Sequence, residues 1–251
     1  WLSARAVIGL FAANTVDHDS IRLFRDAKRS EELTTLHFLR QQQKKAPGRP
    51  NYCLADFVHP LEEANNPTDY VGAFAVTAGE GIEEHVRRFE RQHDDYNAIM
   101  VKALADRLAE ALAERMHQRV RTEFWGYAQE ETLDNTQLIA ERYRGIRPAP
   151  GYPACPEHTE KGTLWKLLDV EKHIGMRLTE SFAMYPAASV SGWYFSHPEA
   201  RYFGLGEINE EQAADYAQRK GWPIEEALKW LGPNLKASDQ PSAAVRSNDA
   251  P

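Results

Sequence analysis

Residues 82–122 read IEEHVRRFERQHDDYNAIMVKALADRLAEALAERMHQRVRT, the longest stretch of the chain with the apolar spacing of an α-helix. Apolar side chains recur there every three or four residues, which places them along one broad face of a helix. These side chains are Val86, Phe89, Tyr96, Met100, Ala103, Leu104, Leu108, Ala111 and Leu112. We therefore expect one long central helix that packs this face against the core of the protein.

The rest of the chain alternates between strand-like and helix-like patterns. A continuous apolar run at residues 6–13 is typical of a buried strand. Short β-rich runs predict neighbouring strands at residues 51–58 and 70–76, and later strands at 182–184, 190–195 and 202–208. Helices are predicted at residues 30–44, 135–143, 163–175 and 209–220. These patterns predict an α+β fold with a mixed, largely antiparallel twisted sheet flanked by helices, including the long central one.

Three local signals set the expected helix ends. Leu33, Leu36 and Leu39 are spaced as in a helix, which we expect to end before Pro47 and Gly48. Asp134 is a candidate N-cap for the helix at residues 135–143. Gly175 is a candidate C-terminal residue for the helix at residues 163–175.

Length and composition favour one folded domain. The chain has 251 residues, of which 42% are apolar, enough for a substantial core. We expect the folded body to span residues 1–235. Residues 236–251, KASDQPSAAVRSNDAP, lack aromatic residues and periodicity and are expected to form a disordered tail. Because the chain begins at Trp1 and enters a strand pattern almost at once, we expect it to be part of a longer polypeptide.

Charge and cysteine content argue against several protein classes. Two cysteines cannot build a disulfide framework, and no long apolar run is present, so we expect a cytoplasmic protein that neither spans nor anchors in a membrane. A net charge of −7 argues against a nucleic-acid partner. A local basic run could either meet an acidic protein partner or simply be a solvated face. It consists of Lys28, Arg29, Arg40, Lys44, Lys45 and Arg49.

Residues 147–158, RPAPGYPACPEH, place four prolines in a short loop. Each proline holds φ near about −65° and lacks an N–H donor, so the segment is neither a helix interior nor a central strand. Its backbone is therefore stiff before any ligand arrives. The loop could hold a small zwitterion through the guanidinium of Arg147, the backbone at Gly151 and the ring of Tyr152. Alternatively, it is a rigid connection between elements.

Glu110 is an unusual carboxylate on the predicted central helix. At about 100° per residue it falls at the margin of the apolar face, between Ile99 and Ala103. A carboxylate there either pairs with a neighbouring arginine or faces a cleft and meets a cationic ligand group.

Other chemical motifs are weaker. Cys155 and His158 have a CxxH spacing, but no second Cys or His pair accompanies them, so we predict no metal site. Glu157, His158 and Glu160 could exchange protons, yet no partnered nucleophile is recognisable, and we predict no catalytic residue. The aromatic run at residues 190–204 fits core strands, although a ring near its turn could lie at a pocket mouth and stack on a base.

Five long motifs together resemble one known family over nearly the whole chain. They are RPAPGYPACPEHTEK from Arg147, NYCLADFV from Asn51, QHDDYNAIMVKALADRLAEA from Gln92, TESFAMYPAASVSGWYFSHPEARYF from Thr179, and WLGPNL ending at Leu235. These motifs closely resemble the C-terminal activation domain of cobalamin-dependent methionine synthase.

The resemblance implies a domain that binds S-adenosylmethionine and supports the reductive methylation of inactive cobalamin held by a neighbouring domain. It also implies a flavodoxin-type electron donor, and zinc only elsewhere in the parent methyltransferase. By position, Arg147 matches the family arginine at the ligand, Glu110 a pocket carboxylate, and Tyr202 with Phe203 an aromatic pair. The loop backbone is expected to meet the adenine and ribose at Ala149, Gly151, Tyr152 and Ala154.

One departure from the family bears on function. The family domain has an upstream segment, in an Asp-Trp-Thr context, whose aspartate holds the amino group of the ligand, and that segment is missing here. We therefore expect weakened ligand binding and no synthesis of methionine by this chain alone. An alternative hypothesis is a non-catalytic docking module for the cobalamin domain and the reductase, using the basic run.

Overall fold

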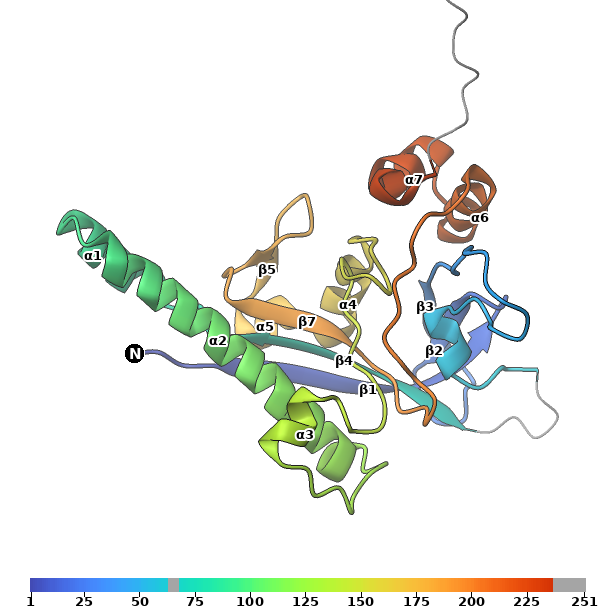
Figure 1. The fold of residues 1–251 in the computed structure, drawn as a ribbon, viewed down its shortest axis with the longest axis horizontal. Helices are drawn as coiled ribbons and strands as arrows, with labels where there is room; N and C mark the ends of the chain where they lie inside the picture. The colour runs from blue at the N-terminus through green and yellow to red at the C-terminus, as the bar shows by residue number, and fades with distance from the viewer. Residues whose placement is uncertain (63–67, 237–251) are drawn as a thin grey trace, which may run out of the picture.

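A computed structural model describes residues 1–62 and 68–236, and its centre is a five-stranded antiparallel sheet (Figure 1). The strands lie in the order β3-β2-β1-β4-β7. Their bounds are β1 Arg5–Val16, β2 Ser20–Phe24, β3 Glu32–His37, β4 Asp69–Thr77 and β7 Ser189–Tyr194. The expected α+β class is confirmed, as are the strands predicted at residues 6–13, 70–76 and 190–195. The predicted tail lies, beyond Lys236, outside the described residues.

Strand β4 is buried on both faces, which explains its continuous apolar sequence. Val71, Ala73 and Ala75 pack in one core cluster with the helices α4 (Glu160–Leu168) and α5 (Val170–Ile174). The alternating residues Phe74 and Val76 pack in a second cluster with α2 (Asp95–Arg119). The sheet therefore separates two helical layers, as the period of two along a strand requires.

The predicted central helix is present but divided. Helix α1 (Ile82–Arg91) and α2 are separated at residues 92–94, where His93 has a φ of 54°. The Asp94 carboxylate accepts the backbone N–H of Asn97 and caps α2. A π-helical turn, η2 (Val120–Phe124), follows α2.

The buried face of α2 is not the one predicted. Alanines with one valine face inward, namely Ala98, Val101, Ala105, Ala109 and Ala113. Tyr96, Ile99 and Leu104 are 71%, 65% and 53% exposed. Small side chains let the helix lie close to its neighbours, while Tyr96, Ile99 and Leu104 point outward. Of the predicted residues on α2, Leu112 does pack against the core. The prediction followed apolar spacing alone, which does not show that the alanine face is the one that can pack most closely.

The helix predicted at residues 30–44 is wrong. Leu36 lies in strand β3 opposite Ile21 of β2, whereas Leu39 lies in the following coil and packs in a different core cluster. The two leucines therefore have a helical spacing in the sequence although they pack in two separate parts of the core. The coil is held by Arg40, whose guanidinium contacts the carboxylates of Asp19 and Asp56.

Two predicted strands are also wrong. Residues 51–58 contain the 3-10 turn η1 (Leu54–Phe57), because the Asp56 carboxylate accepts the N–H of Cys53. The segment 202–208 is coil rather than strand, held by the N–H of Leu205 donating to the carbonyl of Pro153. Of the residues predicted at 182–184, only Met184 is in a strand, within the hairpin of β5 (Arg177–Leu178) and β6 (Met184–Tyr185).

The remaining helices largely follow their local signals. Asp134 caps α3 (Asn135–Ile139), and Asn209 caps α6 (Glu210–Lys220). Gly175, with a φ of 72°, ends α5 as expected. Helix α7 (Ile224–Leu231), which was not predicted, precedes the 3-10 turn η3 (Gly232–Asn234). Helices α6 and α7 pack together at the end of the molecule remote from α1 (Figure 1).

The basic run does not form one open face. Two aspartates already neutralise Arg40, and Lys45 donates to Gln41 and to the carbonyl of Pro50. Lys28, Lys44 and Arg49 are exposed. This arrangement reduces the positive charge that the docking hypothesis requires. Among the described residues, no helix combines the length and hydropathy needed to cross a membrane.

Candidate ligand-binding site

The proline-rich loop is attached to the edge of the central sheet. Ile146 and Phe195 exchange backbone hydrogen bonds of 3.0 Å, and the carbonyl of Pro148 accepts the N–H of Trp193 at 2.8 Å. The segment thus continues the sheet beyond β7 for three residues, using the carbonyl of a proline that has no N–H to offer. Arg147 lies between the two paired residues, so its backbone position is set by the sheet.

Two glycines permit this close approach. A Cβ on Gly192 would lie 2.5 Å from the carbonyl oxygen of Pro148. Gly145 has a φ of 85°, and a Cβ there would collide with the carbonyl oxygen of Phe195. Glycine is therefore needed at both positions for steric reasons, and at Gly145 also for its backbone conformation.

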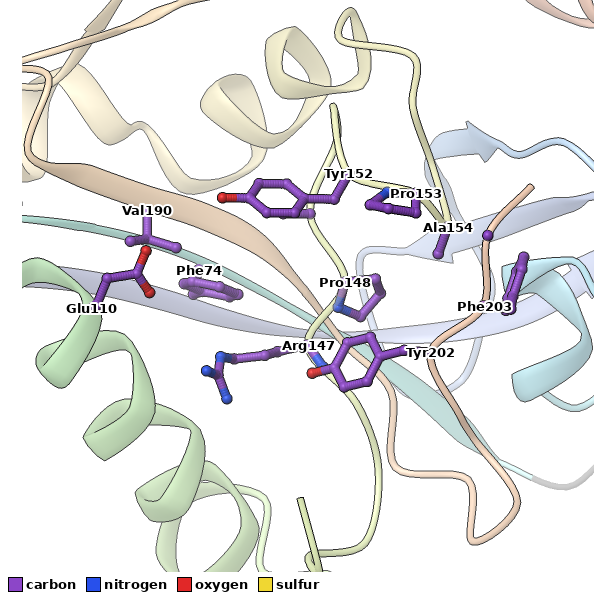
Figure 2. Close-up of a pocket in the computed structure, with 12 residues that line it drawn as sticks. Phe74, Glu110, Arg147, Pro148, Tyr152, Pro153, Ala154, Val190, Tyr202 and Phe203 are labelled. Carbon is purple, nitrogen blue, oxygen red and sulfur yellow. The ribbon is translucent and has the colours of Figure 1, made fainter. Parts of the chain in front are cut away.

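A pocket of about 500 Å³ opens between the loop, helix α2 and the coil that follows β7 (Figure 2). It is lined by Phe74, Glu110, Arg147, Pro148, Ala149, Tyr152, Pro153, Ala154, Val190, Tyr202, Phe203 and Gly204. Phe74 and Val190 come from the sheet, and Glu110 comes from α2. The rings of Tyr152 and Tyr202 lie on opposite sides of Pro148 in this view. A concave, mainly apolar pocket with a few charged groups is typical of a small-molecule site.

Arg147 provides the cationic group of the pocket. Its side chain extends from the loop toward α2 (Figure 2), where Nη1 lies 2.8 Å from Oε2 of Glu114. The same nitrogen lies 3.3 Å from the hydroxyl of Tyr143. Burial disfavours the charged guanidinium, but Glu114 and the surrounding tyrosines more than offset this, so the pKa of Arg147 is raised. Arg147 therefore carries a permanent positive charge.

The aromatic pair at residues 202 and 203 has two separate roles. The Tyr202 hydroxyl accepts the backbone N–H of Arg147 at 3.0 Å. The ring of Phe203 packs with Tyr52 and Phe57 at centroid distances of 5.9 and 6.4 Å. Tyr202 thus joins the coil to the loop, while Phe203 anchors the coil in the core.

Seven of the eight predicted site residues line one pocket. Gly151 is the exception: it has a φ of 95° and lies against His158. Glycine is favoured there by the positive φ, and a side chain at this position would also collide with the imidazole ring. Glu110 does reach the pocket, but it is exposed and lies beside the alanine face of α2 rather than at the margin of the predicted face.

Several neighbours of Arg147 were not predicted from sequence. Glu114 lies one helical turn after Glu110, a spacing that puts both on one side of α2. His117, one residue short of a further turn, is fully buried and stacks on Tyr194 at 5.3 Å. Burial, followed by Arg121 and Arg147, holds the pKa of His117 well below its usual range, so its ring is neutral. The i, i+4 repeat was visible in the sequence, but Tyr143 had no such signal.

The other end of the loop is closed by a buried ionic cluster. The carboxylate of Glu157 accepts hydrogen bonds from Thr159, from the hydroxyl of Tyr216 at 2.8 Å, and from Lys220 Nζ at 3.3 Å. Lys220 also lies 2.7 Å from Glu160. Because Lys220 is on α6, this cluster fixes the loop to the C-terminal helices.

Cys155 and His158, which were considered for other chemistry, both contact neighbouring groups of the fold. Cys155 is buried and donates to the carbonyl of Ala149 at 3.0 Å, and burial raises the pKa of its thiol. His158 lies 2.9 Å from Lys161 Nζ. Within residues 1–62 and 68–236, no cluster of three or more His, Cys, Asp and Glu side chains is arranged to hold a metal ion.

The sequence and the coordinates match characterised proteins. The family model for the activation domain of vitamin B12-dependent methionine synthase matches residues 1–221. A solved structure, the crystal structure of the MetH reactivation domain bound to AdoHcy, is 58% identical in sequence, with a TM-score of 0.90. The similarity covers 94% of this chain and 71% of that one. The role of this family is to reactivate the parent methyltransferase. The chain therefore belongs to the activation-domain family of vitamin B12-dependent methionine synthase.

Proposed function

We propose that the chain binds S-adenosylmethionine in the pocket beside Arg147. The supporting observation is that a permanently charged guanidinium, a stiff loop and two tyrosine rings border one cavity of about 500 Å³. The related solved domain binds AdoHcy, the demethylated form of this ligand. A cavity of this size suits a nucleoside with an amino-acid substituent.

The carboxylate, the nucleoside and the sulfonium of the ligand each have a chemical complement in the pocket. The ligand carboxylate pairs with Arg147, since a guanidinium presents two parallel donors to a carboxylate. The adenine and ribose lie along the loop at Ala149, Tyr152 and Ala154, and Glu110 offsets the positive charge of the sulfonium. The rings of Tyr152 and Tyr202 are available to the adenine or the sulfonium.

The same proposal assigns the partners of the domain. Cobalamin, held by a neighbouring domain of the parent enzyme, would supply the cobalt that accepts the methyl group. The sulfonium carbon–sulfur bond breaks in that transfer, and the ligand leaves as S-adenosylhomocysteine. A flavodoxin-type protein would supply the electron that reduces the oxidised cobalt, so that the cobalt can accept the methyl group. This chain contributes binding and orientation, and its role in the transfer is one of proximity.

Titration calorimetry of the chain with S-adenosylmethionine tests the proposal. We expect one ligand per chain. Arg147→Ala should weaken binding by about 2 kcal/mol, roughly thirtyfold, because it removes one partner of a desolvated charge pair. Arg142→Ala is the matched control, since Arg142 is exposed and lies outside the pocket lining. Equal affinities for Arg147→Ala and the unmodified chain would rule out this binding mode.

A further inference from the structure

Among the described residues, the side-chain hydrogen bonds and the ion pair of the Arg147 guanidinium all involve one nitrogen. Nη1 lies 2.8 Å from Glu114 Oε2, 3.3 Å from the hydroxyl of Tyr143 and 3.5 Å from His117 Nδ1. Within the described part of the chain, Nε and Nη2 have no hydrogen-bond partner, and neither is a buried orphan. One edge of the guanidinium is therefore free and accessible.

The backbone of Arg147 cannot adjust to a ligand. Ile146 is hydrogen-bonded to Phe195, the residue after β7, and Pro148 to Trp193 in β7, while the N–H of Arg147 donates to Tyr202. The direction of the guanidinium then depends on its side-chain torsions alone. A long, unpaired side chain would populate several rotamers and lose that freedom on binding.

We propose that Glu114 is a positioning residue, which holds Nη1 of Arg147 so that the Nε and Nη2 edge faces the carboxylate of the ligand. This inference rests on the proposed function. Glu114 is not among the residues that line the pocket. It acts through Arg147, from the helical turn that follows Glu110.

The electrostatics of the neighbours suit this role. His117 is neutral, so it does not compete with Arg147 for the Glu114 carboxylate. Glu114 balances the charge of Arg147, which leaves the charge of Glu110 for the cationic groups of the ligand. Together, Glu110, Glu114 and Arg147 carry a net negative charge that complements the net positive charge of S-adenosylmethionine.

The geometry argues against the opposite role, in which Glu114 blocks the arginine and must be displaced by the ligand. A blocking carboxylate would occupy both donors of the accessible edge. Glu114 instead contacts Nη1, the same nitrogen that faces Tyr143 and His117. Its removal would free the guanidinium to rotate without uncovering a new donor edge.

Two ligands separate positioning from general damage to the pocket. Glu114→Ala should weaken binding of S-adenosylmethionine about tenfold, within the range of coupling energies between contacting residues. It should change the affinity for 5′-methylthioadenosine, which lacks the carboxylate, by less than twofold. In an Arg147→Ala background, Glu114→Ala should have no further effect. Glu123→Ala is the matched control, because Glu123 lies in η2 and pairs with Arg119 at 2.8 Å, away from Arg147.

A readout without ligand tests the same role. Nitrogen-15 NMR of labelled arginine should show restricted rotation of the Arg147 guanidinium in the unmodified chain and faster rotation in Glu114→Ala. Unchanged or tighter binding of S-adenosylmethionine by Glu114→Ala would overturn the inference, as would equal weakening of both ligands. Failure of the unmodified chain to bind S-adenosylmethionine would instead refute the proposed function, and the inference with it.

Discussion

The two ends of the proline-rich loop are both anchored by charged side chains, but they use their hydrogen-bonding capacity differently. At the first end, the guanidinium of Arg147 is engaged at Nη1 and open at its other edge. At the second end, both oxygens of Glu157 are occupied by donors from Thr159, Tyr216 and Lys220. Arg147 borders a pocket, whereas Glu157 is 3% exposed.

The difference distinguishes a charged group that has donors available for a ligand from one that has none. A buried charge with every donor and acceptor occupied contributes to the fold and has nothing left for a ligand. A charge held at one edge and open at the other is oriented and still available. The Glu157 cluster therefore fixes the position of the loop, whereas the Arg147 end borders the pocket in which we propose that the ligand binds.

The largest expected effect comes from removing the cation of the Glu157 cluster at the second end of the loop. Lys220→Met leaves Glu157 and Glu160 buried without their cation and should lower the free energy of unfolding by about 3 kcal/mol. Arg147→Ala should lower it by about 1 kcal/mol, because that pair is partly exposed. Urea denaturation measures both. Lys229→Met, at an exposed lysine, is the control, and similar losses for Lys220→Met and Arg147→Ala would contradict the comparison.

A substitution at Gly145 should disrupt the attachment of the first end of the loop, next to Arg147, to the sheet. Gly145→Ala should cost about 3 kcal/mol, since it combines a left-handed φ with a collision at the carbonyl of Phe195. Gly175→Ala is the matched control: its φ is 72°, but a Cβ there meets nothing within 4 Å, so the cost should be about 1 kcal/mol. Thermal and urea unfolding give the difference. Equal losses would mean that the contact with β7 is unimportant.

Acid should destabilise the protein through His117, which lies beside Arg147 at the first end of the loop. Its pKa is lowered in the folded protein, chiefly by burial, so the unfolded chain binds a proton more readily as the pH falls below about 6.5. The contribution of this group to the free energy of unfolding is therefore fully present above that pH. It is lost progressively as the pH falls further, with a slope approaching about 1.4 kcal/mol per pH unit for one proton.

The comparison that isolates His117 is His117→Gln, measured by urea unfolding between pH 4.5 and 7.5. The variant should lose less stability over this range than the unmodified chain. Both proteins should still lose some stability as the pH falls, because burial, Arg219 and Lys220 lower the pKa of His37 to about 4. Parallel pH profiles would show that His117 is not a source of the acid sensitivity.

The smallest effect should follow from Tyr202→Phe. The change removes the acceptor of the Arg147 N–H, but Tyr202 is 40% exposed and water can replace it, so the loss should be about 0.5–1 kcal/mol. Affinity for S-adenosylmethionine should fall about threefold. Tyr185→Phe, which removes a 3.3 Å contact with Glu83, controls for loss of a surface hydroxyl. A tenfold or larger loss of affinity would show that the hydroxyl contacts the ligand directly.

Local signals in the sequence predicted much of the secondary structure. The cap at Asp134 and the helix end at Gly175 depend on residues within one helical turn, and both are observed. The strands at residues 6–13, 70–76 and 190–195 were recognisable because they are buried on at least one face. The helix wrongly predicted at residues 30–44 shows the limit, since Leu36 and Leu39 keep a helical spacing while belonging to different clusters.

The lining of the pocket was likewise predicted only in part. Motif resemblance and the stiffness of the loop led to Arg147 and to six other residues that line the pocket. Glu114 and Tyr143 were missed because their importance comes from contact with Arg147 across the fold. Gly145 and Gly192 were missed for a related reason: the backbone that approaches them belongs to a segment about 50 residues away in sequence.

The sequence by itself therefore determined the stiffness of the loop, the helix caps, the antiparallel α+β class and the family. Each of these depends on the conformation of a few consecutive residues or on a long continuous motif. Only the tertiary structure decided which face of α2 is buried, which basic residues are already paired, and which edge of Arg147 remains open. Burial and hydrogen-bond pairing are set by residues distant in the chain, so a local pattern cannot specify them.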